Sequence, residues 1–421
     1  MKNDLWEKIF EKYGVLKEIE KNGQYEISSK SINDFREARL MTKFDNASQL
    51  PKIFLENKLS ILPITRGNYL IAPMKIFHDF PKIEHSGEIS YLEFPEHIQS
   101  LSPDTITSEA LALNAAYLSG ILKDFIGDEQ ISPTVNGRMS SSAFNFNIKN
   151  SQKEGTINVN VNNAQIEIDA GYEGAEYLSI IEAKNHLSDD FVIRQLYYPM
   201  RLCSSSITKP VKTIFMVYTN NIFHLYEYKF EDIQDYNSLI LNRFQKYSFE
   251  KMDISIEDIE HILNTVTVLQ EPSIPFPQAD SFERVINLCE LLYNRDLTKR
   301  DITIEYGFDK RQTDYYVNAG KYLELIKEHE GVISLSSTGK DIMNKPPTRR
   351  QLGFVHQILQ HAVFNSVLKK QFKTGALLSK SEIIDTMKKY PLFNVIREST
   401  YLRRSSTVSS WINWITSLIT G

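Results

Sequence analysis

The stretch AQIEIDAGYEGAEYLSIIEAK, residues 164–184, decides the fold that we expect for this chain. Two mainly apolar runs, Gln165 to Ala170 and Tyr177 to Lys184, flank a segment that contains Gly171 and Gly174. Such runs around a turn-rich segment predict a β-hairpin with a loop of several residues. The return strand is apolar on both faces, and strands of that kind usually lie inside a sheet.

Charged side chains gather at the open end of this hairpin. Glu182 and Lys184 are two residues apart, so they share one face of the return strand, beside Asp169 at the end of the first strand. Two carboxylates and an ammonium at a sheet end are unfavourable unless they bind something. Carboxylate oxygens suit magnesium, Mg²⁺, which keeps several waters and shares its other positions with phosphate. The alternative is a surface ion pair, which contributes little.

The arrangement Asp-x12-Glu-x-Lys, formed by Asp169, Glu182 and Lys184, resembles the PD-(D/E)XK nuclease superfamily. The resemblance implies metal-dependent hydrolysis of a phosphodiester bond, with both acids as Mg²⁺ ligands. Lys184 would stabilise the attacking hydroxide or the phosphate charge. Ile168 stands where the family often has a proline. Because Glu-x-Lys triplets also occur by chance in most proteins, the flanking segments decide the interpretation.

The segment before the hairpin predicts a helix with Thr107 or Ser108 as its N-cap and Glu109 in its first turn. In many nucleases of this superfamily a helix before the sheet supplies an extra acid to the metal site, so the resemblance makes Glu109 a further metal ligand. The alternative is a partner for the helix dipole, which contributes about 0.3–1 kcal/mol.

The segment after Lys184, DDFVIRQLYYPMRLCSSS, predicts a second helix with Asp189 or Asp190 near its start. The resemblance implies that Gln195 orients the catalytic site and that Tyr198 binds backbone phosphate, whereas a polar edge on a packed helix is the alternative. Pro199 predicts a kink or an early end. Two more strands follow around Asn220 and Asn221, which completes the αβββαβ order expected of this superfamily.

Residues 281–346 predict a helix, a short helix, a longer helix and a β-wing, an order that resembles a winged helix-turn-helix. In such domains the third helix enters the major groove of DNA. An ordinary helical bundle also fits this period. Side chains at the start of the third helix would reach base edges, and Arg and Gln read guanine and adenine; here they are Lys310, Arg311, Gln312 and Tyr315.

Residues 347–421 predict a second helix-turn-helix. Arg403 and Arg404 would open its last long helix and contact DNA. A C-terminal helix for packing or dimerisation is the alternative.

A chain of 421 residues is long enough for about three domains. The expected fold class is α/β, a mixed-sheet α+β core of the PD-(D/E)XK kind, with a mainly α C-terminal region. We expect an N-terminal α+β accessory module with possible DNA contacts over residues 1–100, a catalytic domain over 101–269, a proline-containing linker over 270–280, the winged-helix domain over 281–346 and the second helical domain over 347–421.

Charge is distributed unevenly along the chain. The net charge is −5, but residues from Ser281 onward hold 21 Lys and Arg against 14 Asp and Glu, whereas the first 280 hold 27 against 39. A basic C-terminal third predicts contact with a polyanion. Cys203 and Cys289 match no metal or redox spacing, and no apolar run approaches the ~18 residues of a membrane span. We therefore expect a cytoplasmic protein.

Together these features predict a Mg²⁺-dependent, site-specific endonuclease that cleaves double-stranded DNA and resembles type II restriction enzymes. One catalytic domain cuts one strand, so a homodimer is expected, and a restriction role implies a cognate DNA methyltransferase as a functional partner. A repair or Holliday-junction nuclease of the same fold is one alternative. The other is a winged-helix transcriptional regulator whose nuclease-like domain is inert.

Overall fold

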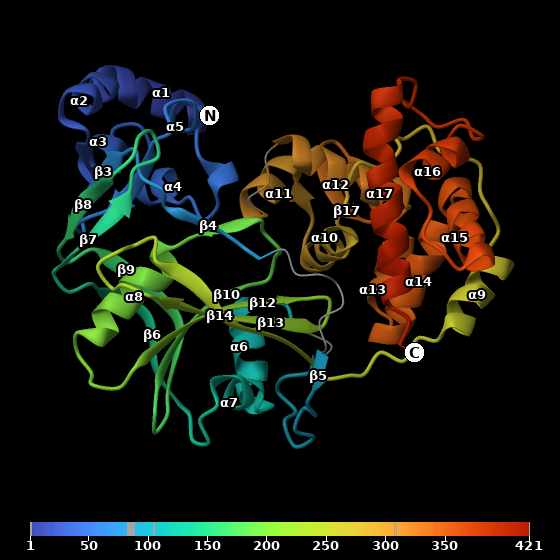
Figure 1. Ribbon diagram of the computed structural model, residues 1–421, viewed down its shortest axis with the longest axis horizontal. Coiled ribbons are helices and arrows are strands. Elements are labelled where there is room, and N and C mark those ends of the chain that lie inside the picture. Colours follow the sequence, from blue (N-terminus) through green and yellow to red (C-terminus); the bar gives the residue numbers. More distant parts are fainter. Residues whose placement is uncertain (1, 82–88, 104–105, 307, 309, 421) are drawn as a thin grey trace.

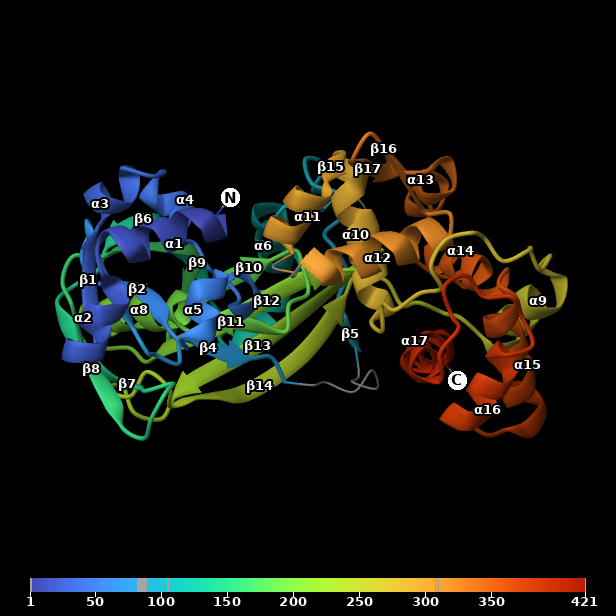
Figure 2. The same cartoon turned by 90° about the horizontal axis from the view of Figure 1, so that it is seen from above.

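The computed structural model describes residues 2–81, 89–103, 106–306, 308 and 310–420. The structure is mixed α/β, as the sequence predicts. Figure 1 shows two lobes: the N-terminal helices and a large sheet form one, and the helical C-terminal half forms the other. Figure 2 shows the same two lobes from above.

The N-terminal module surrounds a three-stranded antiparallel sheet of order β1-β3-β2. Its strands are β1 (Tyr25–Ser28), β2 (Ser60–Pro63) and β3 (Asn68–Ala72), and its helices are α1 (Lys2–Lys12), α2 (Val15–Asn22), α3 (Ser29–Asn33), α4 (Ala38–Thr42), η1 (Ala47–Gln49) and α5 (Lys52–Glu56). Trp6, Phe10 and Phe54 form a cluster of edge-to-face ring contacts in its core. Leu62 and Leu70 belong instead to a core that they share with strands of the large sheet, so the module is docked on that sheet.

The large sheet has seven strands in the order β5-β14-β13-β12-β10-β9-β6. They are β5 (Ile89–Tyr91), β6 (Ser132–Ser140), β9 (Gln165–Glu173), β10 (Leu178–Lys184), β12 (Val211–Thr219), β13 (Ile222–Phe230) and β14 (Leu239–Ser248). The predicted hairpin is β9–β10, and β10 lies inside the sheet, as predicted. β10 pairs in parallel with β12, and the chain crosses from one to the other through the helix α8 (Arg194–Ser204). β9 pairs antiparallel with both β6 and β10.

Helices cover both faces of this sheet. α8 packs on the face that presents Phe215 and Val217 of β12, and α6 (Glu109–Leu118) with α7 (Ile121–Ile126) packs on the face that presents Ile214 and Met216. The alternation of apolar side chains along β12 thus serves two cores. Figure 1 shows α6 and α7 below the sheet.

Three local expectations are corrected by the structure. The single helix expected after Ser108 is broken at Gly120, whose φ of 80° suits glycine. Residues 190–192 form the strand β11 (Asp190–Val192), paired with β4 (Phe77–Asp79), so α8 starts later than predicted. α8 also continues through Pro199, so the early end expected there is wrong, because the buried face of the helix offsets the one lost hydrogen bond.

A further strand pair, β7 (Phe144–Lys149) with β8 (Thr156–Val161), is inserted between β6 and β9. The predicted turn at Asn220 and Asn221 joins β12 to β13, and both residues have positive φ, of 52° and 61°. Asparagine tolerates this region better than most residues.

The C-terminal lobe begins with α10 (Phe282–Asn294), β15 (Leu297–Thr298), α11 (Lys299–Glu305), α12 (Lys310–Tyr322), β16 (Ile326–His329) and β17 (Val332–Leu335). The strands form a small antiparallel sheet of order β15-β17-β16, and β15 is an element that the sequence analysis missed. The lobe continues with α13 (Ser337–Met343), α14 (Pro347–Leu359), α15 (Ala362–Thr374), α16 (Lys380–Met387) and α17 (Glu398–Ser417).

One hydrophobic cluster runs through the whole C-terminal lobe and includes Ile254, Ile259 and Leu263. The last two lie on α9 (Ile256–Thr265), which packs against α14. The domain boundary expected at residue 269 therefore assigned α9 to the catalytic domain, although this helix packs with the C-terminal lobe. Residues 281–346 and 347–421 share this core, so they form one packed unit where two were expected. Amphipathicity predicts that a helix buries one face but does not identify its partner.

Cys203 and Cys289 are both buried free thiols. Within the described ranges, no helix is long and apolar enough to cross a membrane.

Shortening a buried side chain of α9 tests the assignment of this helix to the C-terminal core. Ile259 is fully buried, so I259A should lower the free energy of unfolding by about 2–5 kcal/mol and weaken amide-exchange protection in α14. On the same helix Ile256 is 43% exposed, so I256A should change the free energy by less than ~1 kcal/mol. Loss of protection in the large sheet, with α14 unaffected, would contradict the assignment.

Candidate active site

The candidate site lies where β9 separates from β10. Pairing between these strands runs from Leu178 and Glu173 to Ile181 and Ala170, and then it stops. β10 continues beside β12 as far as Lys184. Beyond the last paired residues, the Asp169 side chain replaces the backbone pairing, because its Oδ2 accepts a hydrogen bond from the Ala183 amide at 2.9 Å. The carboxylate is thus fixed beside the last residues of β10.

Three of the predicted catalytic side chains meet at Glu182. Its Oε1 accepts hydrogen bonds from Lys184 Nζ and from Gln195 Nε2, each at 2.5 Å. Lys184 Nζ also donates to the Ala183 carbonyl oxygen at 3.2 Å. Glu182 is only 7% exposed. Strand alternation brings Glu182 and Lys184 together, and the crossover helix α8 delivers Gln195.

Burial controls the ionisation of this cluster. It raises the pKa of Glu182 to about 8, against the opposing effect of the Lys184 ammonium. Burial acts to lower the pKa of Lys184, but the carboxylates of Glu182, Glu109 and Asp45 outweigh it, so this pKa lies above its ordinary value. Lys184 therefore remains a cation. Its side chain is 14% exposed and lies against Glu182.

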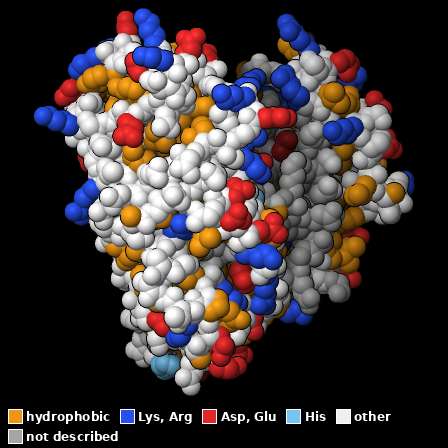
Figure 3. Space-filling view, turned by 60° about the vertical axis from the view of Figure 1, so that its left-hand side comes forward, with side chains coloured by type: hydrophobic (Ala, Val, Ile, Leu, Met, Phe, Trp, Pro, Cys, Tyr) orange, Lys and Arg blue, Asp and Glu red, His pale blue; other side chains and the backbone are white. Residues whose placement is uncertain are grey.

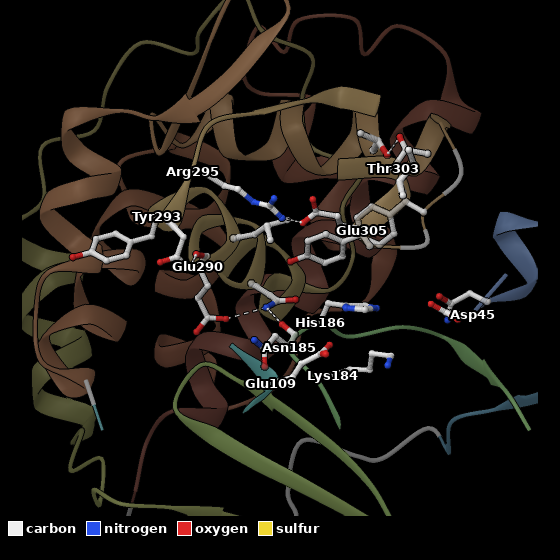
Figure 4. A pocket seen from close by; sticks show the side chains of 18 of the residues that line it. Asp45, Glu109, Lys184, Asn185, His186, Glu290, Tyr293, Arg295, Thr303 and Glu305 are labelled. Carbon is white, nitrogen blue, oxygen red and sulfur yellow. Dashed lines mark hydrogen bonds and ion pairs between the residues drawn. The ribbon is translucent and has the colours of Figure 1, made fainter. Parts of the chain in front are cut away.

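Glu109 is the first residue of α6, whose N-cap is Ser108; the Ser108 hydroxyl oxygen accepts a hydrogen bond from the Leu111 amide at 3.2 Å. Burial raises the pKa of Glu109, Lys184 lowers it and Asp169 raises it, so Glu109 lies within electrostatic reach of the cluster. Figure 4 shows Glu109 next to Lys184. Because Glu109 lies at a helix N-terminus, it could act either as a metal ligand or as a partner for the helix dipole.

Asp45 and His186 belong to this environment but were not predicted. Asp45 comes from the N-terminal module and contributes to the raised pKa of both Glu182 and Glu109 (Figure 4). Burial, aided by Lys184, lowers the pKa of His186 to about 4, so its ring is neutral at pH 7. The adjacency of His186 to Lys184 was visible in the sequence, whereas nothing in the sequence linked Asp45 to a strand more than 130 residues away.

Tyr198 lies outside the site. Its side chain is buried, and its hydroxyl donates a hydrogen bond to the Pro63 carbonyl oxygen at 3.0 Å. The phosphate-binding role considered for Tyr198 is therefore wrong in this structure, because the side chain ties α8 to the N-terminal module.

The expected DNA-reading residues lie in two places. Lys310 lines the cleft beside the candidate site, whereas Arg311, Gln312 and Tyr315 do not. Arg311 Nε donates a hydrogen bond to the Tyr315 hydroxyl at 2.6 Å. Lys310 and the other three therefore belong to different surfaces of α12.

Arg403 and Arg404 lie in the second turn of α17, because this helix begins at Glu398; the expectation that they open it is wrong. Arg403 is exposed. Burial lowers the pKa of Arg404, and Tyr315 opposes this shift, which places Arg404 within electrostatic reach of α12.

A cleft of about 1610 Å³ is lined by Lys184 and Glu109 together with residues of both lobes, whereas Asp169, Glu182 and Gln195 are not among its lining residues. Among the described residues, ten Lys or Arg and five Asp or Glu side chains line it, although the chain as a whole has a net charge of −5. Figure 3 shows the surface hollowed between the lobes, with Lys and Arg at the rim. Basic residues come from both sides, and they include Lys2, Arg36, Lys43, Lys299, Arg300 and Lys310. Such a lining favours a polyanion.

The donor set suits one kind of metal. In the part of the chain that the structure describes, no three His, Cys, Asp or Glu side chains are grouped to hold a metal ion. Structural and catalytic zinc sites need three or four protein ligands, whereas Mg²⁺ is bound by one or two carboxylates together with waters and phosphate. Asp169 and Glu182 provide two carboxylates. Gln195 Oε1 is buried without a hydrogen-bond partner among the described residues, so it could accept from a metal-bound water.

Family models match three consecutive parts of the chain, and each describes a domain of unknown function. DUF6996 matches residues 3–71, DUF6997 matches residues 72–248 and DUF7226 matches residues 284–420. No curated protein and no solved structure matches the chain. The second match ends with β14 and the third begins in α10, so α9 falls between them.

The raised pKa of Glu182 predicts a pH-dependent stability without added metal. Between the ordinary carboxyl pKa and about 8, the folded protein holds a proton that the unfolded chain has released, so stability falls as pH rises. E182Q mimics the protonated form and should escape this loss. Its free energy of unfolding in EDTA should rise relative to the wild type by roughly 1–4 kcal/mol between pH 5 and pH 8. If the free energies of unfolding of the two proteins changed with pH in parallel, this account would be contradicted.

Proposed function

We propose that this protein is a Mg²⁺-dependent endonuclease of the PD-(D/E)XK type that cleaves double-stranded DNA at a specific site, as type II restriction enzymes do. One observation carries the proposal. Lys184 and Gln195 both donate to Glu182 where β9 leaves β10, Asp169 binds the Ala183 amide beside them, and Lys184 lines a basic cleft.

The order of elements around the site supports the same proposal. The helix α6 is followed by the antiparallel strands β6, β9 and β10, the crossover helix α8 and the parallel strand β12. Without α7, the inserted pair β7 and β8, and β11, these elements follow the αβββαβ order expected of a PD-(D/E)XK core. The domain models that match the chain carry no function, so the proposal depends on the site and the topology.

The chemistry assigns a role to each side chain. Asp169 and Glu182 would hold Mg²⁺, and the ion when bound polarises the phosphoryl group and lowers the pKa of bound water. Gln195 fixes the orientation of the Glu182 carboxylate. Lys184 remains protonated among carboxylates and would stabilise negative charge on the attacked phosphate. Water oxygen would bond to phosphorus as the bond to the 3′ oxygen breaks, leaving a 5′-phosphate and a 3′-hydroxyl.

The C-terminal lobe supports DNA as the substrate. Its order of α10, β15, α11, α12, β16 and β17, with the sheet β15-β17-β16, is typical of a winged helix-turn-helix, in which α12 would enter the major groove. Lys310 at the start of α12 lines the same cleft as Lys184. One catalytic centre per chain cuts one strand, so a homodimer would cut a duplex, and a cognate methyltransferase would protect host DNA.

Removing the candidate lysine gives the first test. K184A should lower Mg²⁺-dependent cleavage of unmethylated plasmid DNA by about 100-fold or more, because a charge-stabilising group is lost. DNA affinity measured with Ca²⁺ should change little, since many other basic side chains line the cleft. Cleavage at the wild-type rate would exclude this mechanism.

Basic side chains of the cleft should contribute to DNA affinity through salt-dependent phosphate contacts. Arg300 is exposed and lines the cleft, so R300A should weaken binding of unrelated DNA sequences to a similar extent and reduce the salt slope of log K by about 1. Lys380, exposed on α16 away from the cleft, provides the matched control, and K380A should bind DNA as the wild type does. Equal effects of the two substitutions would argue against DNA in this cleft.

A further inference from the structure

Helix α10 of the C-terminal lobe holds the segment that directly follows Lys184. Asn287 on this helix is 2% exposed. Its Nδ2 donates a hydrogen bond to the Asn185 carbonyl oxygen at 2.8 Å, and its Oδ1 accepts one from the Leu187 amide at 3.3 Å. One side chain therefore fixes the peptide groups on both sides of His186.

The same helix also holds the end of the neighbouring strand. Glu290 accepts hydrogen bonds from the Thr219 hydroxyl and the Asn220 amide, both at 2.7 Å, and from Asn287 Nδ2 at 3.0 Å. Thr219 is the last residue of β12, which pairs with β10. α10 thus joins the ends of both parallel strands through one polar network, and Figure 4 shows Glu290 beside Asn185.

Other polar contacts attach the two lobes without Asn287. Arg284 forms an ion pair with Asp189 at 2.7 Å, and Gln351 Nε2 donates a hydrogen bond to Asn220 Oδ1 at 2.6 Å. Attachment of the lobes does not depend on Asn287 alone. What distinguishes Asn287 is its two hydrogen bonds within three residues of Lys184. Because hydrogen bonds are directional, they fix the position of this segment more narrowly than apolar packing would.

We infer that Asn287 is a positioning residue for Lys184, and that it couples the seating of DNA on the C-terminal lobe to cleavage. This inference rests on the proposed function. α10, α11 and α12 share one hydrophobic core, and α11 and α12 line the cleft. A displacement of this lobe on DNA therefore reaches the peptide groups after Lys184 through α10. Recognition and catalysis would be linked, which restricts cleavage to correctly seated DNA.

The test compares two buried asparagines of the C-terminal lobe in the full-length protein. Asn365 on α15 is 3% exposed and donates to the Leu359 carbonyl oxygen at 3.1 Å, far in sequence from the Lys184 segment. N287A and N365A each remove a buried amide, so both should lower stability. N287D provides a second variant of similar volume that keeps an acceptor for Leu187 and loses the donor to Asn185 and Glu290.

Three measurements separate positioning from general destabilisation. In N287A and N287D the cleavage rate at saturating DNA should fall roughly tenfold to a hundredfold, with the DNA dissociation constant changed less than about twofold. Amide exchange over residues 182–190 should become faster. N365A should cut at the wild-type rate and show unchanged exchange over 182–190.

The two proposals fail in different ways. Unchanged exchange over residues 182–190 in both Asn287 variants, or a rate loss no larger than that of N365A, would overturn the positioning role. A wild-type protein that cuts no DNA with Mg²⁺ would overturn the proposed function. In that case faster exchange over 182–190 would still show that α10 fixes the end of β10.

Discussion

The candidate site depends on one contact, the hydrogen bond from Lys184 Nζ to Glu182 Oε1 at the end of a buried strand. An ammonium and a carboxyl group removed from water are stabilised only when further partners satisfy them. Gln195 and the Ala183 carbonyl oxygen supply those partners, and Asp169 binds the Ala183 amide that lies between the two charged residues. Burial and neighbouring charges shift the pKa values of Glu182 and Lys184 at this strand end, and groups with shifted pKa values cluster at functional sites.

Three parts of the chain converge on this centre. The N-terminal module brings Asp45 and basic side chains, the sheet brings the acids and Lys184, and the C-terminal lobe brings α10 and the basic side chains of α11 and α12. The contacts of α10 with the strand ends are polar and specific. Under the proposed function, this cleft would place DNA against the strand end.

The sequence predicted how Asp169, Glu182 and Lys184 lie relative to one another because their arrangement depends on local rules. A period of two puts Glu182 and Lys184 on one face, and a hairpin places Asp169 beside them. The sequence failed where distant packing decides. Asp45 and Asn287 reach the site from other parts of the fold, α9 packs with the C-terminal lobe, and Tyr198 points away from the site toward Pro63. Helix ends, such as the start of α17, depend on caps that are weakly encoded.

The most direct test of the central claim is digestion of unmethylated phage and plasmid DNA with the wild-type protein, with Mg²⁺ or with EDTA, followed by mapping of the DNA ends. The account predicts discrete fragments that appear only with Mg²⁺ and carry 5′-phosphates at one recurring sequence. DNA that is bound by the protein yet remains intact under every metal condition would contradict it.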